Sequence, residues 1–471
     1  MANGLTASLG KYADTVNAAI DRTGRQQVVK RIWQKDATLW KSEPAHQEII
    51  TNSLGWLEVP AEMKAVAKDL TTFADQIREE FAFVVLCGMG GSSLCPEVLR
   101  QTFGAQPGHP ELLVLDSTDP DVIAALTRQI DLDRSLFIIA SKSGTTTEPL
   151  TFYKYWYALV GERNANPGNS FAAITDPGTK MVEMATRDKF RRIFLTRADI
   201  GGRYSALSYF GLVPAALMGV DFMKLLDGAE KIAQACSVNI QGQANPGVLL
   251  GTTMGECAKS RRDKLTLLVD RRLAALGLWI EQLVAESTGK EGQGIIPVNQ
   301  EPLGPPEVYG EDRVFVSISV GELDSETSAS LKALEAAGHP IIYRKLNDAY
   351  DLGEEFFLWE FATAIAGWIL EINPFDQPNV QESKDATREL LDYFTKHGKL
   401  PEPAAMIRDG GLSVFTDQAA ATLSAGVSQA LSEHLARVNR GDYIALLVYV
   451  EETPAEGTLE TIRKYLRDAT M

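Results

Sequence analysis

The stretch 136–157, LFIIASKSGTTTEPLTFYKYWY, predicts a buried strand, a loop rich in hydroxyl side chains and then a helix. A strand that runs through a short loop into a helix is typical of a parallel α/β sheet. The backbone N–H groups at the start of a helix favour the binding of an anion. Hydroxyl side chains lie next to the helix start predicted here. The hydroxyl residues are Ser141, Ser143, Thr145, Thr146 and Thr147. The stretch therefore predicts a cradle for a phosphate monoester.

The same loop has a second interpretation, as a helix cap that binds nothing. Thr145 and Glu148 fit a capping box, and Pro149 is tolerated in the first helical turn. The loop alone leaves both interpretations open.

Apolar strands alternate with helical patterns on both sides of this loop, in two series. The first series contains FAFVVLCG (81–88), ELLVLDST (111–118), FAAITDP (171–177) and RIFLTR (192–197), and the second contains KLTLLVD (264–270), GIIPV (294–298), RVFVSIS (313–319) and PIIYRKL (340–346). Continuous apolar strands between helices indicate parallel sheets that are buried on both faces. We expect two tandem three-layer α/β/α domains, with a site in the cleft between them.

The pattern divides the chain into four parts. We expect a helical N-terminal arm over 1–75, a first α/β domain over 76–245, a second over 246–398 with crossing helices, and a small C-terminal α/β unit over 399–471. In this last unit, DGGLSVFTD (409–417) and YIALLVYVE (443–451) are the predicted strands, with a helix between them and another at 458–469.

Composition excludes several classes of protein. The net charge of −16 over 471 residues argues against a nucleic-acid surface, which needs excess lysine and arginine. No segment approaches the length of a membrane span, and no signal peptide is recognisable. The cysteines Cys87, Cys95, Cys236 and Cys257 have no metal-site spacing, so we expect no metal and a reducing, cytoplasmic location.

A glycine loop, GMGGSS (88–93), follows the first predicted strand and opens a helix. A dinucleotide-binding loop requires G-x-G-x-x-G, but Ser93 holds the sixth position, although Asp116 follows the next strand as such a site would require. Glycines also let a backbone approach a sugar or a phosphate closely, so a sugar-phosphate site is the other interpretation.

Five motifs in this order resemble the phosphoglucose isomerase family, which is built from two sugar isomerase (SIS) domains. They are GMGGSS (88–93), SKSGTTTE (141–148), GGRYSALSYFGL (201–212), ESTGK (286–290) and INPFDQPNVQESK (372–384), and the resemblance covers roughly 81–391. The loop SGTTTEP (143–149) and the stretch KEGQGIIPV (290–298) are similar to the isomerase part of bacterial transaldolase/phosphoglucose isomerase fusion proteins.

The resemblance implies a role for each matching residue. Ser92, Ser141, Lys142, Ser143 and Thr146 match the phosphate-binding residues, and Glu286 matches the catalytic base. Arg203 matches the arginine that faces the developing enediolate. Lys384 matches the lysine associated with ring opening, and Gln377 matches a polar residue that lines the same site.

One family feature is missing from the sequence. The family commonly supplies a ring-opening histidine from a GQH segment of the neighbouring subunit, and this chain has no such segment. Its five histidines are His46, His109, His339, His397 and His434, all in positions typical of solvated surface residues, with His339 the least improbable substitute. Either another group opens the ring, or the enzyme uses open-chain substrate, or the chain stops short of the residue.

The resemblance implies an aldose–ketose isomerase that interconverts glucose 6-phosphate and fructose 6-phosphate through a cis-enediolate, without cofactor, in a homodimer. Two alternatives remain open at this point. The site could also accept mannose 6-phosphate, or the tandem domains could bind a sugar phosphate without chemistry. A binding module needs the hydroxyl loop but neither Glu286 nor Arg203.

Overall fold

The computed structural model describes residues 4–401, 403–415, 426–439, 441–450 and 452–469. The chain forms two compact units, one with residues 1–376 and 449–467 and the other with 377–448 and a few residues near the C-terminus. The first unit contains both of the large sheets. The four-part division expected from the sequence stays a prediction.

The first sheet has the strand order β3-β2-β4-β5-β6, and every pairing in it is parallel. Its strands are β2 (Phe83–Cys87), β3 (Glu111–Leu115), β4 (Ser135–Ala140), β5 (Phe171–Thr175) and β6 (Arg192–Leu195). All six residues of β4 are buried, as expected for a central strand with helices on both faces.

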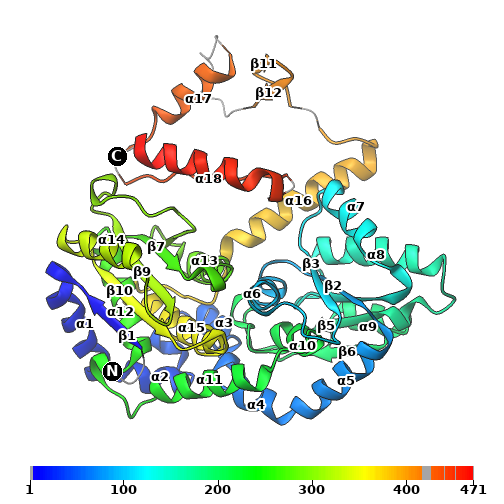
Figure 1. The fold of residues 1–471 in the computed structure, drawn as a ribbon, viewed down its shortest axis with the longest axis horizontal. Helices are drawn as coiled ribbons and strands as arrows, with labels where there is room; N and C mark the ends of the chain where they lie inside the picture. The colour runs from blue at the N-terminus through cyan, green and yellow to red at the C-terminus, as the bar shows by residue number, and fades with distance from the viewer. Residues whose placement is uncertain (1–3, 402, 416–425, 440, 451, 470–471) are drawn as a thin grey trace. The chain divides into compact units, whose positions relative to one another are not determined.

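Alternate residues of β4 enter different cores. Phe137 stacks on Trp156 and Phe171 beneath α8 (Thr147–Gly161) and α9 (Lys180–Arg187). Leu136 and Ile138 belong to the larger core, which contains α6 (Leu94–Phe103) and α10 (Tyr209–Leu217). Figure 1 shows these two helical layers on opposite faces of the cyan and blue strands, with α7 (Pro120–Gln129) beside α8.

The second sheet has the strand order β1-β10-β9-β7-β8. Its strands β7 (Lys264–Val269), β8 (Ile296–Asn299), β9 (Arg313–Val320) and β10 (Ile341–Leu346) are parallel, which confirms the predicted fold class. The helices that pack with these strands include α13 (Leu276–Thr288) and α14 (Ser325–Ala336).

The N-terminal arm differs from the helical prediction at its start. Residues Leu5–Ser8 form β1, which pairs antiparallel with β10 at the edge of the second sheet. The helices α1 (Ala13–Arg25), α2 (Val28–Trp33), α3 (Pro44–Thr51), α4 (Val59–Ala65) and α5 (Ala67–Glu80) follow. The indole N–H of Trp40 donates to the Ala364 carbonyl at 2.8 Å, so the arm is fixed to the central helix α15 (Leu352–Ile369).

The helix α15 packs against two others, α11 (Phe222–Ala235) and α12 (Pro246–Lys259). The helices α12 and α15 pack closely because α12 carries glycines at four-residue spacing. A Cβ at Gly251 would lie 2.5 Å from the Ala362 carbonyl oxygen, and one at Gly255 would lie 2.6 Å from Ile369.

Within the described residues, no helix combines the length and the apolarity that crossing a bilayer requires.

The second unit contains α16 (Pro378–His397), a hairpin of β11 (Ile407–Asp409) and β12 (Leu412–Val414), and α17 (Val427–Leu435). The strand predicted at 443–451 is wrong for its described residues, because 443–450 form no strand. The predicted helix after 417 begins at Val427, and 416–425 lie outside the described residues. The last helix, α18, spans Glu452–Ala469.

Candidate active site

Three loops meet at the carboxyl edge of the first sheet. The glycine loop (88–93) follows β2, the hydroxyl loop (141–147) follows β4, and the arginine loop (200–208) follows β6. The chain goes from β2 outward to β3 and then returns to β4 on the other side of β2. The carboxyl ends of β2 and β4 therefore flank a topological switch point, where open α/β sheets bind ligands.

The hydroxyl loop holds its side chains through contacts with one another. Ser141 is buried and donates to Thr146 Oγ1 at 2.9 Å, while the Ser143 and Thr145 hydroxyls lie 3.0 Å apart. The helix α8 begins at Thr147, and its N-cap Thr146 makes no side-chain cap bond. The predicted capping box at Thr145 is therefore wrong, and the first N–H groups of α8 have no side-chain cap from Thr146.

Lys142 does not face the hydroxyl side chains of its own loop. Its ammonium group pairs with the Asp176 carboxylate and also donates to the Ala198 carbonyl at 3.2 Å. These contacts tie the hydroxyl loop to the segment that leads into the arginine loop. In this state the charge of Lys142 is balanced by Asp176.

The glycine loop contacts the arginine loop so closely that no side chain fits between them. A Cβ at Gly91 would lie 2.1 Å from the Gly202 carbonyl oxygen, and Ser205 Oγ donates to that same oxygen at 2.6 Å. Ser92, the predicted ligand of this loop, is 9% exposed. Among the described residues, its hydroxyl has no hydrogen-bond partner and so is free to bind a ligand.

We expect Gly91→Ala to lower kcat/KM about 100-fold, because the loop carrying Arg203 must move to admit the methyl group, and a displacement near 1 Å can cost that much. Steady-state kinetics with the sugar phosphate would measure the loss. Gly161→Ala is the matched control, since a Cβ there has no neighbour within 4 Å. Equal activity of the two variants would contradict the proposed fit of these loops.

Arg203 lies in a short 3₁₀ turn, Gly202–Tyr204, and is 4% exposed. Its Nε donates to Ser287 Oγ at 2.7 Å. Its Nη2 donates to the carbonyls of Pro374 and Asp376 at 2.8 and 3.0 Å. Nη1 lies 3.1 Å from Glu286 Oε1. A guanidinium held at this many points is fixed in place.

Glu286 lies in the last turn of α13, one residue before Ser287. Its side chain is 21% exposed, and Oε2 accepts a hydrogen bond from Gln282 Nε2 at 3.2 Å. The Gln282 amide also lies against Gly90, where a Cβ would approach it to 2.6 Å. The structure thus brings Glu286, Arg203 and the glycine loop together, as the sequence motifs implied.

Sequence reasoning missed Lys290, which is 3% exposed beside this pair. Its ammonium group donates to the Asp376 carbonyl at 2.6 Å and to Asp376 Oδ1 at 2.5 Å. Burial lowers the pKa of Lys290, and the nearby charge of Arg203 lowers it further, against the effect of Asp376. The position of Lys290 in ESTGK, four residues after Glu286, was the available signal.

The histidine predictions need correction. His339 is buried against Phe315 and Tyr309, and Nδ1 lies 3.3 Å from Arg262 Nη1, with no contact to the residues above. It is therefore neither a surface residue nor a substitute for the missing group. His46, on α3, is not an isolated surface residue either, because its Nδ1 lies 3.3 Å from Asp376 Oδ2.

Gln377 and Lys384 belong to the second unit, and both are exposed. Gln377 directly precedes α16 and Lys384 lies in its second turn. The structure therefore places Gln377 at the N-cap of α16 and Lys384 within that helix. Their predicted roles stay predictions.

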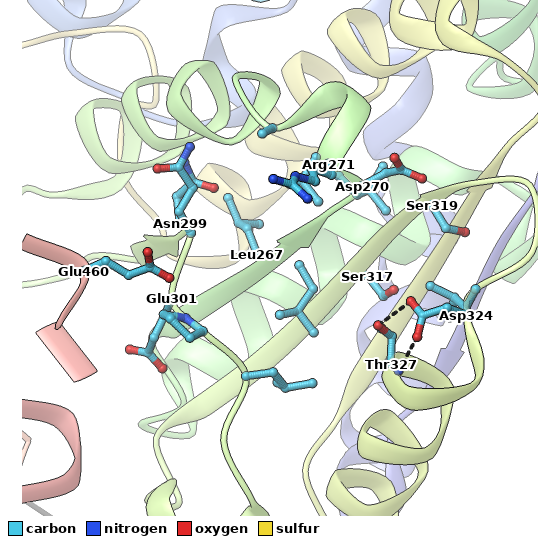
Figure 2. Close-up of a pocket in the computed structure, with 18 of the residues that line it drawn as sticks. Leu267, Asp270, Arg271, Asn299, Glu301, Ser317, Ser319, Asp324, Thr327 and Glu460 are labelled. Atoms are coloured by element: carbon cyan, nitrogen blue, oxygen red, sulfur yellow. Dashed lines mark hydrogen bonds between the residues drawn. The ribbon is translucent and has the colours of Figure 1, made fainter. Parts of the chain in front are cut away.

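A separate cavity of about 560 Å³ lies at the carboxyl end of the second sheet (Figure 2). Arg271 lines it together with five carboxylates: Asp270, Glu301, Glu322, Asp324 and Glu460. The Asp324 carboxylate already accepts the N–H of Thr327 at the start of α14, where an anion would bind. This excess of negative charge disfavours a phosphate monoester, so the three-loop site remains the candidate.

The described residues contain no group of three or more histidine, cysteine, aspartate or glutamate side chains that could hold a metal ion.

The two parallel α/β domains and the loop cluster at the first switch point define a phosphosugar isomerase type of protein. The model of the phosphoglucose isomerase family matches residues 53–300, and the chain belongs to that family.

Curated relatives agree with this assignment, and a solved structure shares the fold. The chain is 28% identical to a probable glucose-6-phosphate isomerase of Methanococcus maripaludis, over 67% of this chain and 80% of the relative. It is also 28% identical to a glucose-6-phosphate isomerase of Prochlorococcus marinus, over 66% and 67%. The crystal structure of a glucose-6-phosphate isomerase from Chlamydia trachomatis has the same fold, with a TM-score of 0.69 at 20% identity over 83% of this chain and 89% of that one.

Proposed function

We propose that this protein is an aldose–ketose isomerase that interconverts glucose 6-phosphate and fructose 6-phosphate. The observation that carries the proposal is the contact between Glu286 Oε1 and Arg203 Nη1 at 3.1 Å, beside the glycine loop. A carboxylate that can move a proton and a fixed cation that can stabilise an oxyanion are the two groups that an enediolate mechanism needs. Membership of the phosphoglucose isomerase family supports the assignment.

In the proposed reaction, the Glu286 carboxylate removes a proton from C2 of the open aldose. The electron pair of the C2–H bond forms the C1–C2 double bond of a cis-enediolate while the carbonyl pair moves onto O1. The hydroxyl proton of O2 then passes to O1, and Glu286 returns its proton to C1 as the ketose carbonyl forms at C2. Negative charge develops on oxygen during this transfer, and Arg203 stabilises it without giving up a proton. The step itself uses no metal ion or organic cofactor.

The substrate phosphate is assigned to the hydroxyl loop, with Ser141, Ser143, Thr146 and Ser92 as its donors and the start of α8 beneath it. Lys142 is proposed to support this loop through Asp176 and to supply positive charge nearby. Lys384 and Gln377 are proposed to assist at the sugar ring, which the match of INPFDQPNVQESK to the family motif supports.

A homodimer and a cytoplasmic location belong to the same proposal. The composite active site of the family supports the dimer, which light scattering during size-exclusion chromatography would test. The four cysteines are free and buried, and burial raises the pKa of Cys236 and of Cys257 to about 12. Buried, protonated thiols suit a reducing compartment.

The decisive experiment measures conversion of fructose 6-phosphate in deuterated water. The proposal expects glucose 6-phosphate to form, with deuterium at C2 in part of the product, because a carboxylate proton can exchange with solvent before it returns. Binding of the sugar phosphate without turnover would favour the non-catalytic alternative. If fructose 6-phosphate is converted but no deuterium appears at C2 under any condition, the transferred proton does not pass through a carboxylic acid that exchanges with solvent. That result would weaken the role proposed for Glu286.

Thr146→Val tests the phosphate cradle because it removes a hydroxyl while keeping the side-chain shape. We expect KM for the sugar phosphate to rise about tenfold to 100-fold, which is the range of one hydrogen bond to a charged group. The control is Thr151→Val, whose hydroxyl bonds the Thr147 carbonyl within the exposed face of α8. An unchanged KM in Thr146→Val would remove this hydroxyl from the site.

A further inference from the structure

A lysine is buried directly after α13, in the turn that follows the helix. The side chain of Lys290 is 3% exposed. Its backbone N–H donates to the Thr288 carbonyl at 2.9 Å, and its carbonyl accepts the N–H of Gln293 at 2.9 Å, so the turn is fixed. The next residue, Glu291, pairs with Lys41 instead. The turn thus holds a cation inside the protein, where burial is costly unless an anion compensates it.

Asp376 supplies this anion and also contacts Arg203. The side chain of Asp376 is 12% exposed, and its Oδ1 accepts from Lys290 Nζ at 2.5 Å. Its backbone carbonyl accepts from Lys290 Nζ at 2.6 Å and from Arg203 Nη2 at 3.0 Å. Two cations therefore donate to one carbonyl oxygen. Their mutual repulsion would oppose this arrangement without the carboxylate beside them.

The second group that faces the Asp376 carboxylate does not provide the same compensation. His46 Nδ1 lies 3.3 Å from Asp376 Oδ2 and 3.2 Å from Asn373 Nδ2. The Asn373 amide oxygen accepts the N–H of Phe375, so the amide nitrogen is the donor that faces the ring. A neutral imidazole then accepts at Nδ1 and has no proton there to give to the carboxylate. The positive charge opposite Asp376 is therefore that of Lys290.

The charge of Lys290 determines how the charge of Arg203 is used. While Lys290 is protonated, it balances Asp376, and the guanidinium of Arg203 faces Glu286 Oε1 at 3.1 Å. Without the ammonium charge, two carboxylates would share one guanidinium, and the group would carry an excess negative charge. An enediolate is itself an anion, so its formation beside this group would then be disfavoured.

We propose that Lys290 is a positioning residue of the isomerase, whose ammonium group neutralises Asp376 and so leaves Arg203 to stabilise the enediolate. This inference rests on the proposed isomerase function, since the negative charge in question develops only in that reaction. Lys290 acts through Asp376 and Arg203, and it keeps its proton throughout the reaction.

The titration of Lys290 provides a pH signature for this role. Burial lowers its pKa, and the charge of Arg203 lowers it further, whereas Asp376 and Glu286 raise it. The net direction is downward, so the ammonium charge is lost at a lower pH than that of an exposed lysine. As pH rises through this range, kcat for fructose 6-phosphate should fall, because Asp376 is left without its counter-charge.

Lys290→Met tests the role by removing the charge while keeping an unbranched apolar side chain. We expect kcat at neutral pH to fall about 30-fold, less than for a donor that contacts the oxyanion directly, with KM little changed. The alkaline fall of the parent should be absent from the variant. Lys224→Met, a lysine of α11 that is 60% exposed, is the matched control and should behave like the parent.

A double variant separates electrostatics from structure. Lys290→Met with Asp376→Asn removes one charge of each sign and keeps the backbone carbonyl that binds Arg203, so it should regain about tenfold of the lost kcat. A purely structural role predicts a further loss, because more contacts are removed. If Lys290→Met does not fold, the double variant carries the test, and it should keep kcat within about tenfold of the parent and lack the alkaline fall.

The outcomes distinguish this inference from the proposed function. Full activity in Lys290→Met, no recovery in a folded double variant, or an alkaline fall that persists in both would each overturn the role of Lys290 and leave the isomerase assignment intact. Absence of fructose 6-phosphate turnover in the parent would overturn the isomerase assignment and this role together. Circular dichroism of each variant measures the folded fraction.

Discussion

Glu286→Gln is expected to lower kcat for fructose 6-phosphate by about 10³-fold, within the range for loss of a general base. The amide has the shape of the carboxylate and can still present its oxygen to Arg203 Nη1, so the site should keep its arrangement. It cannot accept the C1 proton, and the enediolate then forms only through solvent. A coupled assay that detects glucose 6-phosphate would measure the loss, with KM expected to change little.

The control for this variant is Glu162→Gln, an exposed carboxylate at the end of α8. It makes the same chemical change in the same protein, at the end of α8 opposite the hydroxyl loop. A loss of less than tenfold in Glu286→Gln would mean that another group removes the proton. The Arg203–Glu286 contact would then be structural.

The fold could be predicted wherever strands are continuous apolar runs. The run LFIIA (136–140) is buried on both faces of the first sheet, and its neighbours show the same pattern. The strand β1 could not be predicted in this way, because four residues carry no periodic signal and their partner, β10, is more than 300 residues away. The strand predicted at 443–450 is wrong for a different reason. Its residues favour strands, but a strand also needs a neighbouring strand to pair with.

The residues of the candidate site could likewise be predicted from the sequence only in part. Ordered motifs predicted roles for Glu286, Arg203 and the hydroxyl loop because these residues lie within recognisable local sequences. The contacts of Lys142 with Asp176 and of His46 with Asp376 join segments that are distant in the chain. No local sequence pattern encodes such pairs. A lysine in a loop of hydroxyl residues is therefore predicted to bind phosphate, and a histidine on an N-terminal helix is predicted to be solvated.

Arg203→Lys is expected to lower kcat/KM by about 10²- to 10³-fold, the usual cost of removing a preorganised oxyanion donor. The ammonium of lysine is a point charge and cannot reach Ser287, Glu286 and the two carbonyls at once, as the planar guanidinium does. Because the carbonyls of Pro374 and Asp376 then lose a donor in a buried place, the free energy of unfolding should also fall, by about 1–3 kcal/mol.

Arg187→Lys provides the comparison that separates these two effects. Arg187 is 71% exposed and pairs with Asp188 on the surface, where such a contact contributes little to stability. Its variant should retain both activity and stability. If Arg203→Lys unfolds more easily but keeps kcat/KM at temperatures where it is folded, the guanidinium only joins α13 to the segment 374–376. If activity falls while the folded fraction is unchanged, the placement of the charge acts on the reacting sugar, because lysine keeps a positive charge but does not keep its position.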